Sequence, residues 1–397
     1  MALKVSILTR EYPPFIYGGA GVHVGQLVSH LRPLVESIDV QCMGEPRDGA
    51  TAHPETFPPG ANAALRVLGT DVAMAAAVPA VDIVHSHTWY TNLAGLLTGK
   101  LQGVPHVVTS HSLEPHRPWK REQLGGGYDV SLWAERTSFL DAAAVIAVSA
   151  GMRRDVLASY TDLDPAKVHV VHNGIDTTEF QPDPDTSALT GWGVDVDKPL
   201  VTFVGRITRQ KGLVHLVRAA EQFDPGTQLL LLAGAPDTPE IAAEFETAFA
   251  DVKRSGTSVI WIEKMVPRAQ VRQALTQSAV FACPSVYEPL GIVNLEAMAC
   301  GTAVVASAVG GIPEVVADGQ TGLLVPYDPA QAGDPDYVAG FEAAFATSVN
   351  TLLRDPARAA SLGQAGRQRC IEHFDWASIA GETIAVYEQA IAAFKAR

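Results

Sequence analysis

Two glutamates, Glu288 and Glu296, flank a Pro-Leu-Gly turn in the stretch SVYEPLGIVNLEAMACG. Pro289 and Gly291 predict that Glu288 lies on a loop, because a residue before proline is pushed toward extended backbone and glycine permits a sharp turn. The apolar residues from Ile292 onward recur as in a mostly buried helix. Two carboxylates then lie beside a helix N-terminus, whose N–H groups and dipole favour an anion. This pattern indicates a sugar phosphate site, and the alternative is a pair of solvated glutamates.

A basic loop carries the second set of candidate residues. Arg206 and Lys211 lie in RITRQKGL, directly after the apolar run LVTFVG, and Gly212 opens the next helical pattern. Ligands of α/β sheets bind beyond the carboxyl ends of the strands, so we expect both cations to lie near Glu288. Two cations at that place can clamp a diphosphate leaving group. Solvated surface cations are the alternative.

The first half of the chain adds glycines and a histidine. Gly18, Gly19 and Gly21 lead into a helical pattern, where a phosphate can approach the backbone, although the dinucleotide spacing G-x-G-x-x-G is absent. His111 follows the apolar run HVVTS and is either a site residue or a strand-end histidine bonded to backbone. The segment at 172–176, HNGID, is interpreted as a hinge.

Metal chemistry is not supported by the sequence. Aspartates separated by one residue occur three times, as Asp183 with Asp185, Asp195 with Asp197, and Asp334 with Asp336. They lie in proline-rich or linker sequence and predict turns rather than a cation site. No zinc spacing, P-loop or nucleophile elbow is present. We therefore expect neither a metal nor another cofactor.

Short β-branched runs alternate with longer helical patterns along the whole chain, as in KVSILT, VDIVHSH, HVVTSH, LVTFVG and QLLLLAGA. Strands without polar alternation, each followed by a helix, predict parallel sheets covered on both faces. The pattern restarts after an Asp, Pro and Thr-rich stretch at 175–198, which is interpreted as an exposed linker. The expected fold is α/β, with two facing, doubly wound, Rossmann-like domains and an active-site cleft between them. The predicted bounds are 1–180, 181–375, and a helix at 376–397 that crosses back to the first domain.

Composition excludes several classes of protein. The chain has 397 residues, enough for two domains, and its net charge of −14 argues against nucleic acid. No run reaches about 18 apolar residues, and the start lacks a signal peptide pattern, so we expect a cytoplasmic protein without stable membrane association. Four cysteines lack metal or disulfide spacing and are expected to be buried free thiols: Cys42, Cys283, Cys300 and Cys370.

The motifs GGAG, VTSH, GRITRQKGL and PSVYEPLGIVNLEAMACGTAVVAS, followed by GGIPE, resemble the retaining GT-B glycosyltransferases of the bacterial glycogen synthase group. The resemblance covers essentially the whole chain, and YPPFIYGGAGVHV, VHSHTWYTNLAG and HSLEPHRPWKREQLGGGY look like its actinobacterial form. It implies a hexosyltransferase that moves glucose from ADP-glucose, with retention. The acceptor would be glucose 1-phosphate, giving α-maltose 1-phosphate, or the non-reducing end of an α-1,4-glucan.

The resemblance also implies roles for the motif residues. Arg206 and Lys211 would bind the leaving diphosphate, and Glu288 would bind the donor sugar. Glu296 would bind the ribose, and His111 would lie beside the anomeric carbon. The remaining expected contacts to the nucleotide sugar come from Gly18, Gly19, Leu290, Gly291 and Ile292.

Two departures from the glycogen synthase pattern fit a member with altered acceptor handling. Classical members have lysine where this chain has Tyr17, so one donor-phosphate contact is missing, and aspartate where it has Thr88. The loop after His111 also gathers basic residues, although the protein is acidic, and the alternative is a solvated basic loop. A sugar phosphate acceptor needs such charge, whereas a neutral glucan does not. We therefore predict glucose 1-phosphate as the better acceptor, with Tyr17, Arg117, Lys120 and Arg121 as its binding residues.

Other readings stay open at this point. The residues alone do not distinguish ADP from UDP, and they leave a homo-oligomer open. The nearest alternative is a retaining mannosyl- or N-acetylglucosaminyltransferase acting on a small alcohol or lipid, although the apolar stretch ANAALRVLGTDVAMAAAVPA has one arginine and not the basic face of a membrane-docking helix. A nucleotide-sugar-binding regulator without catalysis is the alternative of another class, and it would be expected to lack the clamp or His111.

Overall fold

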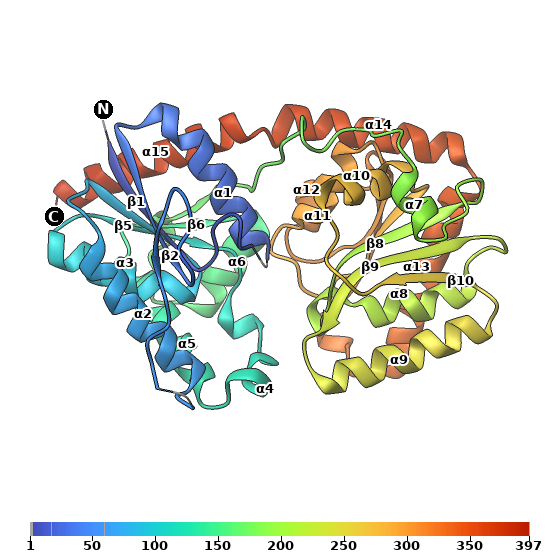
Figure 1. Cartoon of the computed structure of the whole chain (residues 1–397), viewed down its shortest axis with the longest axis horizontal. Helices are drawn as coiled ribbons and strands as arrows, with labels where there is room; N and C mark the ends of the chain where they lie inside the picture. Colours follow the sequence, from blue (N-terminus) through green and yellow to red (C-terminus); the bar gives the residue numbers. More distant parts are fainter. Residues whose placement is uncertain (1–2, 17, 59, 397) are drawn as a thin grey trace. The chain divides into compact units, whose positions relative to one another are not determined.

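Two parallel sheets, each covered by helices, build the chain in this computed structural model, which describes residues 3–16, 18–58 and 60–396 (Figure 1). The chain divides into an N-terminal unit, Met1–Gly174 with Trp376–Arg397, and a C-terminal unit, Ile175–Asp375. The division falls inside the segment HNGID. The predicted pair of parallel α/β domains is confirmed.

The sheet of the N-terminal unit has the strand order β3-β2-β1-β4-β5-β6-β7, with every neighbouring pair parallel. Its strands are β1 (Lys4–Thr9), β2 (Ser37–Met43), β3 (Thr51–His53), β4 (Ile83–His87), β5 (His106–Ser110), β6 (Ala144–Ala147) and β7 (Val168–Val170). The α-helices are α1 (Gly19–Leu31), α2 (Ala63–Ala77), α3 (Trp89–Gln102), α4 (Lys120–Leu124), α5 (Gly127–Asp141), α6 (Ala150–Ser159) and α15 (Trp376–Lys395). All residues of the central strands β4 and β5 are buried, as expected for a parallel sheet covered on both faces.

The sheet of the C-terminal unit has the order β10-β9-β8-β11-β12-β13, again entirely parallel. Its strands are β8 (Leu200–Ile207), β9 (Gln228–Pro236), β10 (Ser258–Ile262), β11 (Val280–Cys283), β12 (Val304–Ser307) and β13 (Gly322–Val325). The α-helices are α7 (Ser187–Gly191), α8 (Leu213–Ala219), α9 (Pro239–Arg254), α10 (Arg268–Gln277), α11 (Ile292–Ala299), α12 (Ile312–Val315), α13 (Pro335–Leu353) and α14 (Pro356–His373).

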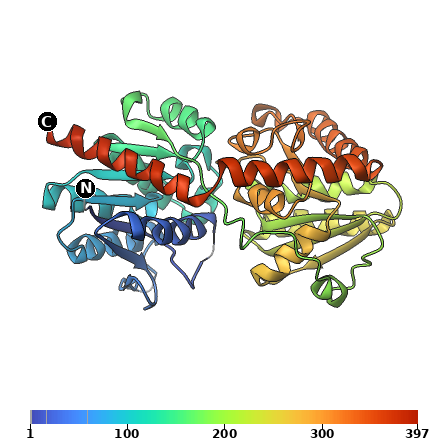
Figure 2. The ribbon, with the colours of Figure 1, turned by 90° about the horizontal axis from the view of Figure 1, so that it is seen from above.

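The C-terminal helix α15 belongs to the N-terminal unit and lies beside α1 (Figures 1 and 2). Its buried residues, among them Tyr387 and Ile391, share a hydrophobic core with Val24 and Leu27 of α1. The helix begins against the backbone of Gly174, where an added Cβ would come within 2.6 Å of the ring of Trp376. The last helix thereby completes the hydrophobic core that also contains the first strand.

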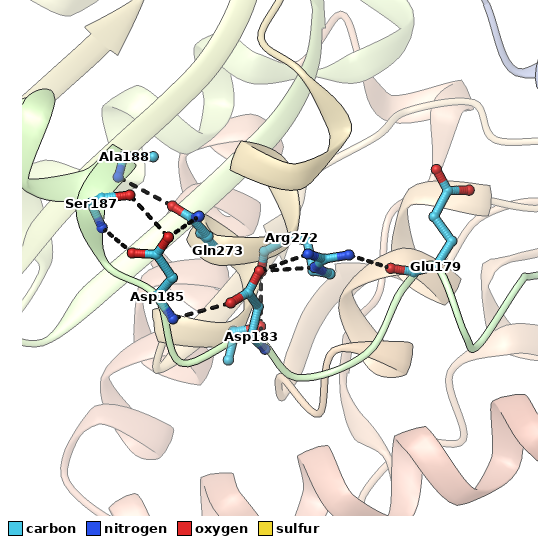
Figure 3. A network of polar contacts seen from close by, with 8 residues as sticks. Glu179, Asp183, Asp185, Ser187, Ala188, Arg272 and Gln273 are labelled. Atoms are coloured by element: carbon cyan, nitrogen blue, oxygen red, sulfur yellow. Dashed lines mark hydrogen bonds and ion pairs between the residues drawn. The ribbon is translucent and has the colours of Figure 1, made fainter.

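The segment after the division, expected to be an exposed linker, is in fact bound to α10 (Figure 3). The guanidinium of Arg272 donates to the carboxylate of Asp183 at 2.8 and 3.0 Å and to the carbonyl oxygen of Glu179 at 3.0 Å. The amide nitrogen of Gln273 donates to Asp185 at 3.0 Å. This part of the segment is therefore attached to α10, although Asp185 is also exposed. Composition alone does not reveal these contacts.

Burial tests the prediction for the cysteines. All four cysteines are buried and free, so the predicted free thiols are confirmed. Within the part of the chain that the structure describes, no helix is both long enough and apolar enough to span a bilayer.

Candidate functional site

The C-terminal unit joins Lys211 to Glu288 at the carboxyl ends of its strands. Lys211 Nζ lies 2.6 Å from Glu288 Oε2, which also accepts a hydrogen bond from Ser285 Oγ at 3.1 Å. Burial alone would lower the pKa of Lys211, but the adjacent carboxylate outweighs it and the pKa is raised above the usual lysine value. Lys211 therefore stays charged. The predicted proximity of the basic loop and the glutamate loop is confirmed.

Close backbone approaches position this pair. Gly212 has φ 61°, and a Cβ there would lie 2.1 Å from the carbonyl oxygen of Pro284, so only glycine fits between the two loops. Gly310 has φ 55°, and its Cβ would lie 1.9 Å from the carbonyl oxygen of Glu288, which accepts the amide of Gly311 at 3.0 Å. The two glycines of GGIPE thus pack beneath the glutamate loop. Sequence reasoning named this motif without finding its task.

Arg206, at the end of β8, pairs with a residue that the sequence did not single out. Its guanidinium lies 3.3 Å from both carboxylate oxygens of Asp237, and its side chain is 32% exposed. A carboxylate here fixes the direction of the arginine and leaves part of its surface to solvent. Asp237 follows β9, so the signal that could have found it is its position after a neighbouring strand.

Helix α11 begins at Ile292, after Gly291 with φ 99°, and carries Glu296 on its second turn. Burial raises the pKa of Glu296 to about 7, and the nearby Arg268 acts against that rise. Leu290, before the helix, is buried. The predicted turn and helix are therefore present. The binding roles of these residues stay predictions.

Asn294 on the same helix was missed. Its side chain is fully buried, and neither its amide nitrogen nor its amide oxygen has a hydrogen-bond partner in residues 3–16, 18–58 and 60–396. An asparagine within an apolar helical pattern is the only sequence signal for it.

In the N-terminal unit His111 lies just beyond β5, within a cluster of histidines. Its Nε2 is 2.9 Å from Nδ1 of His87, and its ring centroid is 4.6 Å from that of His23 on α1. His85 lies 4.2 Å from His87, ring centroid to centroid. Sequence reasoning predicted His111 alone. The missed signal was the alternation in HSH, which places two histidines on one face of a buried strand.

These rings are held neutral by their surroundings. Burial, followed by repulsion from neighbouring histidines, places the pKa values of His85, His87 and His111 well below the usual histidine value. Burial lowers the pKa of His23 to about 4. Three neutral imidazoles suit Zn²⁺, and one nitrogen each of His23, His87 and His111 lies within 4.8 Å of the others. Because His87 and His111 already bond to each other, we assign no metal there.

Gly18 and Gly19, which were predicted to cover the phosphates, lie at the start of α1, where the side chain of Glu11 also binds. The amide of Gly18 donates to Glu11 Oε2 at 2.7 Å, and a Cβ on Gly21 would lie 2.8 Å from Cβ of Glu11. A carboxylate thus takes the anion position at this helix N-terminus. Gly19 is the first helical residue, and Tyr17 lies outside the described residues.

The predicted acceptor residues lie in three different environments. Arg117 is mostly buried and donates to Ser112 Oγ and Glu114 Oε1, each at 3.1 Å, while its Nε has no hydrogen-bond partner among the described residues. Lys120 Nζ donates to Gln123 at the surface. Arg121 forms a bidentate, exposed pair with Asp129. The loop is therefore not one solvated basic patch.

Comparison with known proteins places both units. Residues 190–369 match the family model "Glycosyl transferases group 1", and residues 17–179 match "Glycosyltransferase Family 4". The chain is 59% identical over 391 residues to an alpha-maltose-1-phosphate synthase of Mycolicibacterium smegmatis, covering 98% of this chain and 99% of that protein. It is 56% identical to the enzyme of that name from Mycobacterium tuberculosis, over 98% and 100% of the two chains. A D-inositol 3-phosphate glycosyltransferase of Mycobacteroides abscessus is 32% identical, over 79% and 67%.

Solved structures show the same architecture. Sucrose-phosphate synthase from Thermosynechococcus elongatus superposes with a TM-score of 0.77 at 25% identity, over 98% of this chain and 100% of that one. The catalytic domain of starch synthase IV from Arabidopsis thaliana, bound to ADP and acarbose, gives 0.75 at 19% identity, over 99% and 100%. This chain is therefore a hexosyltransferase and belongs to the GT-B glycosyltransferase family that includes the actinobacterial alpha-maltose-1-phosphate synthases.

Proposed function

We propose that the enzyme transfers glucose from ADP-glucose to glucose 1-phosphate and forms α-maltose 1-phosphate with retention of configuration. The observation that carries this proposal is 59% and 56% identity, over nearly the whole chain, to two proteins named alpha-maltose-1-phosphate synthase. Sugar or cyclitol phosphates also appear in the names of the inositol phosphate and sucrose-phosphate relatives. A small phosphorylated compound, as substrate or product, is the feature that these names share.

The donor residues of the C-terminal unit support a charge-assisted departure of ADP. The bond between the anomeric carbon and the diphosphate breaks, a hydroxyl oxygen of the acceptor bonds to that carbon, and the hydroxyl proton passes to the leaving phosphate oxygen. Lys211 and Arg206 stabilise the charge that develops on the diphosphate. Glu288, already bonded to Lys211, offers a carboxylate oxygen to the sugar hydroxyls. No step needs a metal, so we expect EDTA to leave the rate unchanged.

Arg117 supports the phosphate acceptor. Its guanidinium is partly desolvated beside the buried Glu114, which strengthens any contact that its accessible N–H groups make to a phosphate. Arg117→Lys keeps the charge but loses the planar fork. We expect Arg117→Lys and Lys120→Ala to raise KM for glucose 1-phosphate about tenfold with little change in KM for ADP-glucose. Arg136→Ala, an exposed cation of α5 outside the loop, is the matched control.

The decisive experiment incubates the pure protein with ADP-glucose and either glucose 1-phosphate or glycogen. We expect ADP release that depends on glucose 1-phosphate, and an α-linked phosphorylated disaccharide identified by ³¹P and ¹H NMR. UDP-glucose in parallel reactions tests the nucleotide. Elongation of glycogen without the soluble phosphate product would overturn the proposal in favour of a polymer synthase.

A further inference from the structure

The buried strand β4 carries two histidines that the proposed function does not use. His85 and His87 alternate along the strand and therefore point to the same face of the sheet. The register pairs His87 with Thr109 of β5, so His111, two residues beyond Thr109, continues on that face. Nδ1 of His87 lies 2.9 Å from Nε2 of His111. His87 is thus the hydrogen-bond partner of the predicted site histidine.

His85 is fixed behind His87. Its Nδ1 lies 2.7 Å from the hydroxyl of Tyr387 on α15, and its Nε2 lies 2.6 Å from Oγ1 of Thr109. With both nitrogens bonded, the ring has one orientation, and its centroid is 4.2 Å from that of His87. A residue 302 positions along the chain therefore packs the ring that supports His87.

The residue after His87 is strained. Thr88 has φ 66° and ψ 164°, a region that is essentially restricted to glycine and is unfavourable for a β-branched residue. Its amide donates to the carbonyl oxygen of Thr109 at 3.3 Å, and its own carbonyl oxygen accepts the amide of Thr91 at 3.2 Å. Strain of this kind persists where the surroundings over-determine the backbone, typically at functional sites. Here the two hydrogen bonds hold the backbone of Thr88, which directly follows His87.

We propose that His87 is a positioning residue that holds His111 in one ring orientation and one tautomer, and that Tyr387, through His85, and the strained Thr88 hold His87 in place. The inference rests on the proposed role of His111 beside the transferred sugar. A site imidazole needs a defined tautomer, and in a hydrogen bond between two neutral imidazoles one nitrogen donates and the other accepts, so the tautomer of His111 is complementary to that of His87. The C-terminal helix then contributes to the site as well as to the core.

The first test reads the tautomer without substrate. The full-length enzyme is labelled with ¹⁵N-histidine, and His111→Asn assigns the resonance of His111. We expect one tautomer in the wild type and in His87→Asn, whose side-chain amide reaches the position of Nδ1. His87→Leu should populate both tautomers. His53→Leu, which removes another buried, hydrogen-bonded histidine from the same sheet, is the matched control and should leave His111 unchanged.

The second test separates kcat from KM. We expect kcat to fall at least tenfold in His87→Leu and to recover to within about threefold of the wild type in His87→Asn, with KM for ADP-glucose unchanged. Tyr387→Phe keeps the ring and loses only the hydroxyl, so kcat should fall two- to fivefold. Thr88→Gly relieves the strain, so kcat should fall while the thermal midpoint does not.

Contrary results are equally clear. A single His111 tautomer in His87→Leu, or equal kcat in His87→Leu and His87→Asn, would overturn the inference and leave His87 a packing residue. If the wild type transfers no glucose at all, the proposed function fails, whereas the NMR comparison still decides the positioning role.

Discussion

The two units accommodate buried ionisable side chains in different ways. Both place polar side chains at the carboxyl ends of a buried parallel sheet. In the C-terminal unit Lys211 lies against the carboxylate of Glu288, which raises the pKa of the lysine and keeps its side chain charged. In the N-terminal unit histidines face other histidines, so burial keeps them neutral. A counter-charge decides whether a buried group stays ionised, and only the charged site can offset an anionic leaving group.

The largest expected effect comes from breaking the charged pair. Lys211→Met leaves the carboxylate of Glu288 buried with the Ser285 hydroxyl but without a counter-charge, which typically costs about 3 to 5 kcal/mol of stability. Turnover should fall by more than about a hundredfold, because the leaving group loses its cation. Urea denaturation and ADP release measure the two effects.

The double variant Lys211→Met with Glu288→Gln separates them. It removes both charges, so most of the lost stability should return while turnover stays low. Recovery of turnover together with stability would show that the pair acts only in folding.

Acid should destabilise the N-terminal unit by protonating its buried, neutral histidines. The pKa of His23 is lowered to about 4, so the folded state binds fewer protons than the unfolded state below pH 6.5. The stability that neutral His23 contributes is complete above pH 6.5 and is lost as pH falls toward 4, by about 2 kcal/mol at pH 5. Glu296, with its pKa raised to about 7, has the reverse sign, since its contribution is complete below the unfolded pKa and is lost as pH rises through 7.

The buried cysteines report each unit separately. Cys42 lies in the N-terminal unit, and Cys283, Cys300 and Cys370 lie in the C-terminal unit. Labelling with a pyridyl disulfide, which reacts in acid, followed by peptide mass spectrometry measures local opening relative to the unfolded chain. Protection of Cys42 should fall more between pH 7 and pH 5 than that of Cys370. Equal losses would contradict the contrast between the units.

Most of the fold could be predicted from the strand pattern, because buried parallel strands appear in a sequence as continuous apolar runs. Strand β2 was missed because polar residues interrupt its apolar ones, and the edge strand β3 was missed because it has three residues. The proximity of Lys211 and Glu288 could be predicted because the two residues follow neighbouring strands. Asp237 was missed because its partner Arg206 lies 31 residues away, and Glu11 was missed because no spacing rule connects it to Gly18. Asn294 has no hydrogen-bond partner among the described residues, so no pairing rule could identify it.

Arg206 and Arg209 sharpen the charge comparison within one loop. Arg206 is partly buried and held by Asp237, whereas Arg209 is 45% exposed and lies 3.9 Å from Glu244. Arg206→Ala should lower kcat about a hundredfold, near 3 kcal/mol in activation free energy, with a small loss of stability. Arg209→Ala, the matched control, should change kcat less than twofold. Similar kcat values for the two variants would remove Arg206 from the clamp.

The smallest expected effect concerns Glu296, whose pKa is raised to about 7. If Glu296 accepts hydrogen bonds from ribose hydroxyls, its carboxylate form binds a nucleoside better than its acid form. With the pKa at about 7, the inhibition constant should rise as pH falls from 8 to 6, by at most about tenfold per unit. Adenosine is the suitable inhibitor because it lacks phosphates that titrate in this range. Glu296→Gln should bind adenosine weakly and without this pH dependence. A wild-type inhibition constant that does not change with pH, or an equal slope in Glu296→Gln, would assign the ribose to another residue and leave Glu296 as a buried acid beside Arg268.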